Sequence, residues 1–186
     1  MTTTQTQVST WTIDPVHSIV EFGVKHLNLT TFRGRFRTVS GTITLDETNP
    51  ENSSVMAEID VASLDVPGDR FYGHLFSDAF FHGEEHPKIA FRSTRVQRRD
   101  DDHWTLAGDL TIRGVTREVM LALEYLGQST HPFSGKTVAG FRAETTIERG
   151  DFGMEWNAPM DAGAKYVGEQ VRITLEIEAV RQDPEE

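Results

Sequence analysis

The sequence predicts an all-β protein, built as an antiparallel barrel of about eight strands with one short helical crossover segment. Two observations support this prediction. Apolar and polar residues alternate in about eight segments, most of them separated by short turns. No stretch carries the apolar spacing of a long amphipathic helix. A barrel is favoured over a sandwich because closure removes exposed strand edges, and about eight strands can enclose one small ligand.

The first half of the chain contains three predicted strand regions. They cover residues 12–14 with 18–26, residues 32–46, and residues 54–66. Pro15 interrupts the first region, and Gly34 and Gly41 predict bends or bulges in the second. Asn, Pro and Ser in residues 47–53 predict a turn before the third.

The second half contains five more predicted strands. They cover residues 88–99, 104–113, 118–125, 136–147 and 171–178. Gly114 predicts a tight hairpin between the second and third of these strands. Residues 127–135 are expected to form a polar loop. The last strand has the clearest alternation, with Val171, Ile173 and Leu175 on one face.

An aromatic-rich segment, residues 70–94, connects the two halves. Its large apolar residues are Phe71, Tyr72, Leu75, Phe76, Phe80 and Phe81. Helical spacing predicts one or two turns of helix here, while Gly68, Gly73, Gly83 and Pro87 limit any longer helix. Because so many rings require an apolar partner, we expect Phe71, Leu75, Phe76, Phe80 and Phe81 to form a wall or lid at one end of the barrel. A long loop that fills the core is the alternative.

Composition restricts the classes of function. The chain has 186 residues, of which 37% are hydrophobic and 25% charged, which suits one globular domain. A net charge of −11 argues against nucleic acid and anionic membrane surfaces as partners. The absence of cysteine excludes disulfides, thiol nucleophiles and cysteine-ligated metals.

The ends of the chain predict tails. Residues 1–10 are polar and uncharged and predict a flexible tail, residues 11–181 a single domain, and residues 182–186 a second tail. The N-terminus lacks the basic and apolar regions of a signal peptide, and no apolar run reaches the length of a membrane span. We therefore expect a cytoplasmic protein with no integral membrane segment.

Catalytic and metal-binding motifs are weak in this sequence. His82 and His86 have the spacing of some zinc ligands and lie near Glu84 and Glu85, but Gly83 and Pro87 argue against a regular helix. Serine elbows, phosphate loops and distinctive carboxylate pairs are absent. We therefore predict no catalytic residues, no metal ligands and no cofactor.

Two polar features have a structural and a functional interpretation. Arg33, Arg35 and Arg37 share one face of a predicted strand, which is either an outward polar face or a positive rim for an anionic head group. Residues 109–117 place Gly114 beside Thr and Arg residues, as in a hairpin turn with solvated flanks. The structural interpretation is favoured for both.

Several segments together resemble the YceI family of polyisoprenoid- or lipid-binding proteins. The matching segments are residues 24–27, 31–36, 41–45, 74–75, Ser77, 80–81, 86–94, 106–119, 140–141 and 146–153. Residues 106–119, LAGDLTIRGVTREV, are the most specific of them. The resemblance covers nearly the whole chain, in order and at compatible spacing.

The resemblance implies an elongated, lipocalin-like barrel, closed at one end by a helix-containing segment, that holds an isoprenoid or other long-chain lipid. It brings no catalytic residues, and some members pair as homodimers. Together with the lid residues, the candidate ligand-binding residues are Phe22, Val24, Phe36, Ile43, Ile59, Phe91, Leu110, Leu121, Phe141, Ile173 and Leu175. Alternation alone leaves open whether each of them lines a cavity or packs a solid core.

We therefore predict non-enzymatic binding, storage or transport of a long-chain lipid. A buried alkyl chain gains about 0.8 kcal/mol per methylene before ordering costs. Two alternatives remain: an enzyme acting on a small hydrophobic substrate at the barrel mouth, and an interaction module with a filled barrel.

Overall fold

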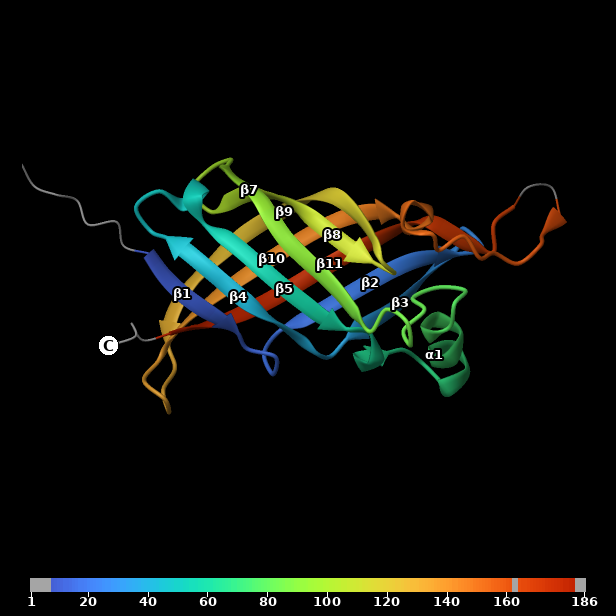
Figure 1. Ribbon diagram of the computed structural model, residues 1–186, viewed down its shortest axis with the longest axis horizontal. Coiled ribbons are helices and arrows are strands. Elements are labelled where there is room, and N and C mark those ends of the chain that lie inside the picture. The colour runs from blue at the N-terminus through green and yellow to red at the C-terminus, as the bar shows by residue number, and fades with distance from the viewer. Residues whose placement is uncertain (1–7, 162–163, 183–186) are drawn as a thin grey trace, which may run out of the picture.

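Eight strands close into an antiparallel barrel, and three further strands, which follow β11 in the order β2-β3-β6, continue its wall at one end (Figure 1). The computed structural model describes residues 8–161 and 164–182. Its strands are β1 (Val8–Ile13), β2 (Ile19–His26), β3 (Thr30–Phe36), β4 (Val39–Asp46), β5 (Ser54–Asp60), β6 (Leu64–Asp65), β7 (Lys88–Arg98), β8 (His103–Ile112), β9 (Val115–Thr130), β10 (Thr137–Glu148) and β11 (Val167–Arg181). The helix α1 (Asp69–Phe76) and the 3-10 helices η1 (Pro50–Asn52), η2 (Val61–Ser63) and η3 (Arg149–Phe152) complete the list. The predicted all-β barrel with a short helical crossover is confirmed.

The barrel closes where the first and last strands meet. Its strands follow the order β1-β4-β5-β7-β8-β9-β10-β11, and β11 returns to β1 through the pairs Trp11–Arg181 and Ile13–Ala179. The rest of the same edge of β11 pairs with β2. β1 and β2 therefore share one edge, separated by the predicted break around Pro15.

Two predicted strands are each divided in two. Residues 32–46 form β3 and β4, because the chain turns at Arg37 and Thr38 and changes partner from β6 to β5. Residues 54–66 form β5, η2 and β6, with the Asp60 carboxylate accepting a hydrogen bond from the Ala62 backbone N–H at 3.1 Å. Both divisions occur at the same place, where the backbone N–H of Arg37 donates to the Ser63 carbonyl at 3.1 Å.

The prediction of a polar loop over residues 127–135 was wrong for residues 127–130. β9 continues to Thr130, and Gly127, with a φ of +100°, pairs with Gly140 beside an irregularity in the register. Backbone pairing with β10 thus outweighs the loop propensity of Gly and Ser. At the N-terminus, β1 starts at Val8, inside the range predicted as a tail; the rest of that tail and most of the C-terminal one lie outside the described residues.

The predicted hairpin at Gly114 is confirmed and also contacts the crossover segment. Arg113 and Gly114 have φ values of +54° and +73°, the left-handed conformation of a tight two-residue turn. The Arg113 guanidinium donates to the Phe80 carbonyl at 2.8 Å and also to the Asp78 carbonyl. The β8–β9 turn therefore holds the segment that follows α1.

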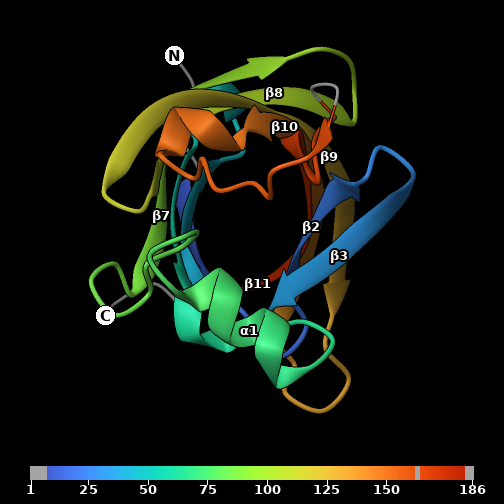
Figure 2. The same ribbon diagram turned by 90° about the vertical axis from the view of Figure 1, so that its right-hand side faces the viewer.

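The aromatic crossover covers one end of the barrel. Figure 2 looks onto this end and shows α1 beside the ring of strands. The Phe81 ring lies edge-on to Phe36, with the ring centroids 5.4 Å apart, and also packs against Phe22 at 6.2 Å. We call this the α1 end. The opposite end, where η1 and the β7–β8 and β9–β10 turns gather, is called the turn end (Figure 1).

Candidate ligand cavity

A cavity of about 500 Å³ lies inside the barrel, with an almost wholly apolar lining. Most of the predicted ligand-binding residues lie in its wall, where the structure places Phe22, Val24, Phe36, Ile43, Ile59, Leu75, Phe80, Phe81, Phe91, Leu110, Leu121, Phe141, Ile173 and Leu175. The cavity wall therefore draws on both the strands and the crossover.

Alternation along the strands is what makes the wall apolar. Val171, Ile173 and Leu175 of β11 face the cavity, whereas Arg172 lies on the outer face and forms an ion pair with Glu144 of β10. Because side chains of a strand point alternately to its two faces, every second residue reaches the interior. The same rule accounts for lining residues that were not among the candidate ligand-binding residues: Val20, Leu45, Val55, Ala57, Val119, Leu123, Tyr125, Ala143, Val171 and Ile177.

Two of the predicted lid residues lie outside the lining. Phe71 is 51% exposed and packs against Phe32 at a centroid distance of 5.6 Å. Phe76 stacks on Tyr72 at 5.6 Å and fills the space in which a side chain at Gly83 would lie. A short helix presents only one face to the barrel, so the crossover contributes Leu75, Phe80 and Phe81 to the wall at this end.

A buried arginine occupies the cavity wall at the α1 end. Arg149 is 4% exposed, and its guanidinium donates to the carbonyls of Gly168 and Trp156, each at 2.8 Å, and to those of Met154 and Val167. Burial lowers the pKa of Arg149. Among the described residues, no carboxylate lies within ion-pair distance of it. The sequence analysis missed this residue because a single arginine in a Gly-containing turn resembles a solvated turn residue.

His74 of α1 lies close to this arginine. Its ring packs edge-on against Trp156 at 4.5 Å and Phe80 at 5.2 Å, and its Nε2 atom is buried without a hydrogen-bond partner. The α1 end thus combines stacked rings with buried polar groups.

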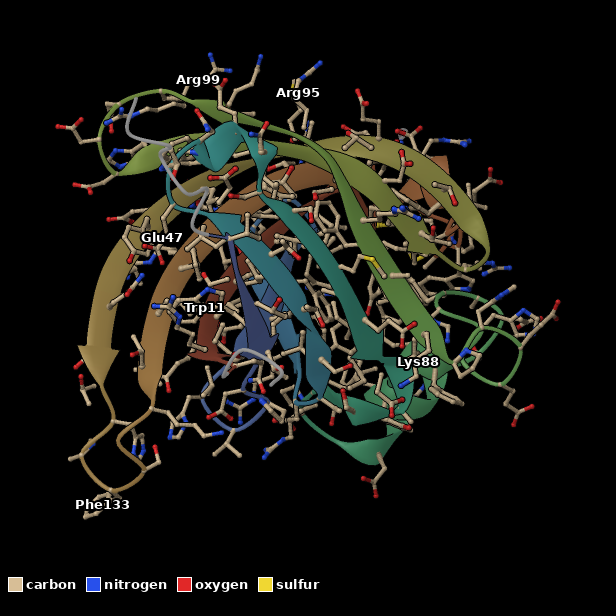
Figure 3. All side chains as sticks on the ribbon, turned by 60° about the vertical axis from the view of Figure 1, so that its left-hand side comes forward. Trp11, Glu47, Lys88, Arg95, Arg99 and Phe133 are labelled. Carbon is tan, nitrogen blue, oxygen red and sulfur yellow. The ribbon has the colours of Figure 1, made fainter. Side chains whose placement is uncertain are left out.

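The turn end carries acidic and polar lining residues instead. They are Asp46, Glu47, Ser53, Asp101, Tyr125 and Gln128. The backbone N–H of Asn49 donates to the Asp46 carboxylate at 2.8 Å and, as the largest cause, lowers its pKa. Glu47 (Figure 3) lies 3.9 Å from the guanidinium of Arg181, which packs over the Trp11 ring on the inner side of the closing strands.

The predicted basic rim is neutralised by an acidic partner. Asp65 of β6 accepts from Arg35 Nε and Arg37 Nη2, both at 2.7 Å, and these bonds lower the pKa of the carboxyl. Arg33 is exposed. The three residues therefore form an outward polar face rather than an open anion site.

Two groups of described residues bring together side chains that could hold a metal ion. One consists of His82, Glu85 and His86, and the other of Asp14, His17 and Glu178. None of these six residues belongs to the cavity lining. No helix in residues 8–161 or 164–182 is long and apolar enough to cross a membrane.

The fold and the site together define a small closed antiparallel barrel around an apolar cavity. Residues 11–179 match the family model described as a YceI-like domain, and the chain belongs to this family. A UPF0312 protein of Pectobacterium atrosepticum is 36% identical over 89% of this chain and 82% of its own length. Protein YceI of Escherichia coli is 35% identical over 89% of this chain and 83% of its own length.

Solved structures share the same fold. The YCEI protein of Campylobacter jejuni has a TM-score of 0.72 at 25% identity, over 86% of this chain and 90% of its own. BcnA of Burkholderia cenocepacia has a TM-score of 0.77 at 19% identity, over 89% and 98%. A polyisoprenoid-binding domain from Saccharophagus degradans has a TM-score of 0.68 at 14% identity, over 95% and 100%. At the lowest identities the likeness concerns the fold alone.

Proposed function

We propose that this protein binds a long-chain isoprenoid or similar lipid in the barrel cavity, for storage or transport and without catalysis. The observation that carries the proposal is the continuous apolar lining of a cavity of about 500 Å³. That volume lies within the range of about 300–1,000 Å³ typical of small-molecule sites. Each methylene transferred from water to such a wall contributes about 0.8 kcal/mol before ordering costs.

The same cavity weighs against a filled-barrel interaction module. Protein interiors are close-packed, and a barrel that served only as a scaffold would fill its centre with side chains. Along β10, two of the residues that face the lumen, Ala143 and Thr145, are small, which keeps space open between the strands.

An enzymatic role is less well supported by the groups in the lining. Arg149 uses its donors on backbone carbonyls, and the Asp46 carboxylate caps the turn that precedes η1. Burial, and to a smaller extent the charge of Glu47, raise the pKa of Tyr125, so its hydroxyl keeps its proton beside Gln128. The polyisoprenoid-binding domain of Saccharophagus degradans adds an example of the same fold whose described ligand is a polyisoprenoid.

A matched pair of substitutions tests the proposal. Ala143 faces the lumen, while the exposed Ala122 lies on the outer face of neighbouring β9, next to Glu144 in register. Ala143→Phe should fill the cavity and reduce the affinity for a fluorescent polyprenol at least about tenfold, the equivalent of about 1.4 kcal/mol. Ala122→Phe should leave it unchanged.

Mass spectrometry of an organic extract of the purified protein identifies the bound lipid. We expect one long-chain lipid species that is depleted from the Ala143→Phe variant. An extract free of lipid, together with equal polyprenol affinities for both variants, would overturn the proposal.

A further inference from the structure

Three side chains with metal-binding atoms meet in the turn that follows the cavity wall at the α1 end. They are His82, Glu85 and His86, and they directly follow Phe80 and Phe81. In the sequence, the objection to a metal site was that Gly83 and Pro87 prevent a regular helix. The structure shows that a helix is not needed to bring the two imidazoles together.

A single turn forms through the backbone of His82. This residue has a φ of +51°, and its carbonyl accepts hydrogen bonds from the backbone N–H groups of Glu85 at 3.1 Å and His86 at 2.9 Å. The turn is anchored to the end of α1, because the N–H of His82 donates to the Ser77 carbonyl and that of Gly83 to the Phe76 carbonyl, both at 2.8 Å. The ligand positions are thus held by backbone contacts before any ion binds.

The side-chain atoms lie at distances that suit one ion. His82 Nε2 is 3.5 Å from one carboxylate oxygen of Glu85, and His86 Nε2 is 3.9 Å from the other. One ligand atom from each of the three residues lies within 4.8 Å of the other two. Ligands about 2.0–2.2 Å from a tetrahedral Zn²⁺ are roughly 3.3–3.6 Å apart, so a small rotation of the exposed Glu85 side chain closes the set.

Packing orients the His86 imidazole, and both imidazoles remain partly exposed. The side chains of His82 and His86 are 33% and 28% exposed. The His86 ring lies against the β8–β9 turn, so closely that a side chain on Gly114 would come within 2.9 Å of its Cε1 atom. Neighbouring cations have other partners: Arg113 donates to the Phe80 carbonyl, and Lys88 lies 3.9 Å from Asp60.

We propose that His82, Glu85 and His86 form a binding site for a divalent transition-metal ion of the Zn²⁺ class. Two imidazole nitrogens and one carboxylate oxygen supply three ligands, and water or an external ligand takes the fourth position. The bound ion cross-links the two ends of the turn that directly follows Phe80 and Phe81 of the cavity wall. The site is independent of the lipid proposal, because its ligands lie outside the cavity lining.

The second candidate group provides an internal control. His17 Nδ1 lies 2.9 Å from the Asp14 carboxylate and 3.7 Å from Glu178. The Asp14 hydrogen bond raises the pKa of His17, which favours a proton rather than a metal ion on that ring. We therefore expect Zn²⁺ to prefer the His82 turn.

Calorimetric titration of Zn²⁺ into chelator-treated protein, with any affinity tag removed, tests the site. We expect saturation at one ion per chain. Losing an outer-shell partner of a metal ligand typically costs about 10- to 100-fold in affinity, so loss of a ligand in Glu85→Gln or His86→Gln should cost at least about tenfold. His17→Gln should leave the affinity unchanged.

A second measurement separates loss of metal binding from loss of folding. Co²⁺ bound by the intact protein should give the visible absorption of a tetrahedral site, and Glu85→Gln, a change at an exposed side chain, should abolish it while the melting transition persists. Absence of saturable binding to the intact protein, or binding lost in His17→Gln but retained in His86→Gln, would overturn the proposal.

Discussion

The two ends of the barrel differ in what closes them. At the α1 end, buried Arg149 and Phe80 pack together, and the half-buried His74 of α1 packs edge-on against Phe80. At the turn end, Glu47 and Asp101 are exposed on turns, and Phe133 at the tip of the β9–β10 loop is 95% exposed (Figure 3).

Removing one partner of a buried hydrogen bond leaves the other polar group without a partner and without water, which costs its full desolvation penalty. Exposed ion pairs contribute little to stability, so the two ends should respond differently to substitution. The α1 end should determine stability. The turn end should determine which head groups reach the cavity.

Two arginines make the sharpest comparison. Arg149 at the α1 end lies 6.0 Å from the Phe80 ring, and Arg98 at the turn end lies 5.7 Å from the Trp104 ring. Arg149→Met leaves several buried carbonyls without donors and should lower the free energy of unfolding by about 3–5 kcal/mol. Arg98→Met removes an exposed ion pair with Asp101 and should cost under about 1 kcal/mol.

Urea denaturation of both arginine variants measures this difference. Losses of similar size would show that the two ends do not differ in their contribution to stability.

Removing an aromatic ring at the α1 end should have the next largest effect. Phe80 is 7% exposed and packs against His74 and Trp156, so Phe80→Ala should cost about 3 kcal/mol or more through cavity formation. Because Phe80 also lines the cavity, we expect weaker lipid binding by the same variant. The denaturant midpoint and the lipid affinity should be measured on one preparation, and an unchanged affinity per folded molecule would contradict the lid role.

Neutralising the turn end should alter selectivity rather than stability. Glu47 and Asp101 line this end of the cavity, and their charges disfavour an anionic head group nearby. The double variant Glu47→Gln/Asp101→Asn should bind a prenyl phosphate about threefold to tenfold more tightly at low salt, with a smaller gain at high salt. A prenyl alcohol of equal length is the control, and equal gains for both ligands would exclude the electrostatic explanation.

The smallest expected effect is a dependence of stability on pH at the turn end. The Asp100 carboxylate accepts from His103 Nδ1 at 2.8 Å, which raises the pKa of His103 above its ordinary 6.5 and lowers that of Asp100 below 3.8. The stabilisation from a raised histidine pKa is fully present below pH 6.5 and is lost as the pH rises through the folded-state value.

His103→Gln and Asp100→Asn should therefore each reduce the fall of the melting temperature above pH 6.5, and the slope that remains comes from His17, whose pKa Asp14 also raises. A slope that is unchanged in both variants would assign the whole effect to another group, such as His17.

The sequence by itself determined the elements whose signal is local. Alternation in residues 171–178 placed Ile173 and Leu175 on the face that lines the cavity, and Gly114 marked the hairpin, because both follow from a few consecutive residues. Closure into a barrel followed from the number of such strands, and most of the candidate cavity wall followed from their inward faces.

Only the tertiary structure decided the features that depend on residues far apart in the chain. Arg149 is held in the cavity wall because the carbonyls of Gly168 and Val167 come to it from β11. Phe71 and Phe76 fall outside the cavity because α1 turns one face to the barrel, a rotation that helical spacing alone leaves open. His82 and His86 meet because the backbone of His82 adopts a left-handed conformation. Hydrogen bonds to the end of α1 stabilise this conformation, and the local sequence does not predict it.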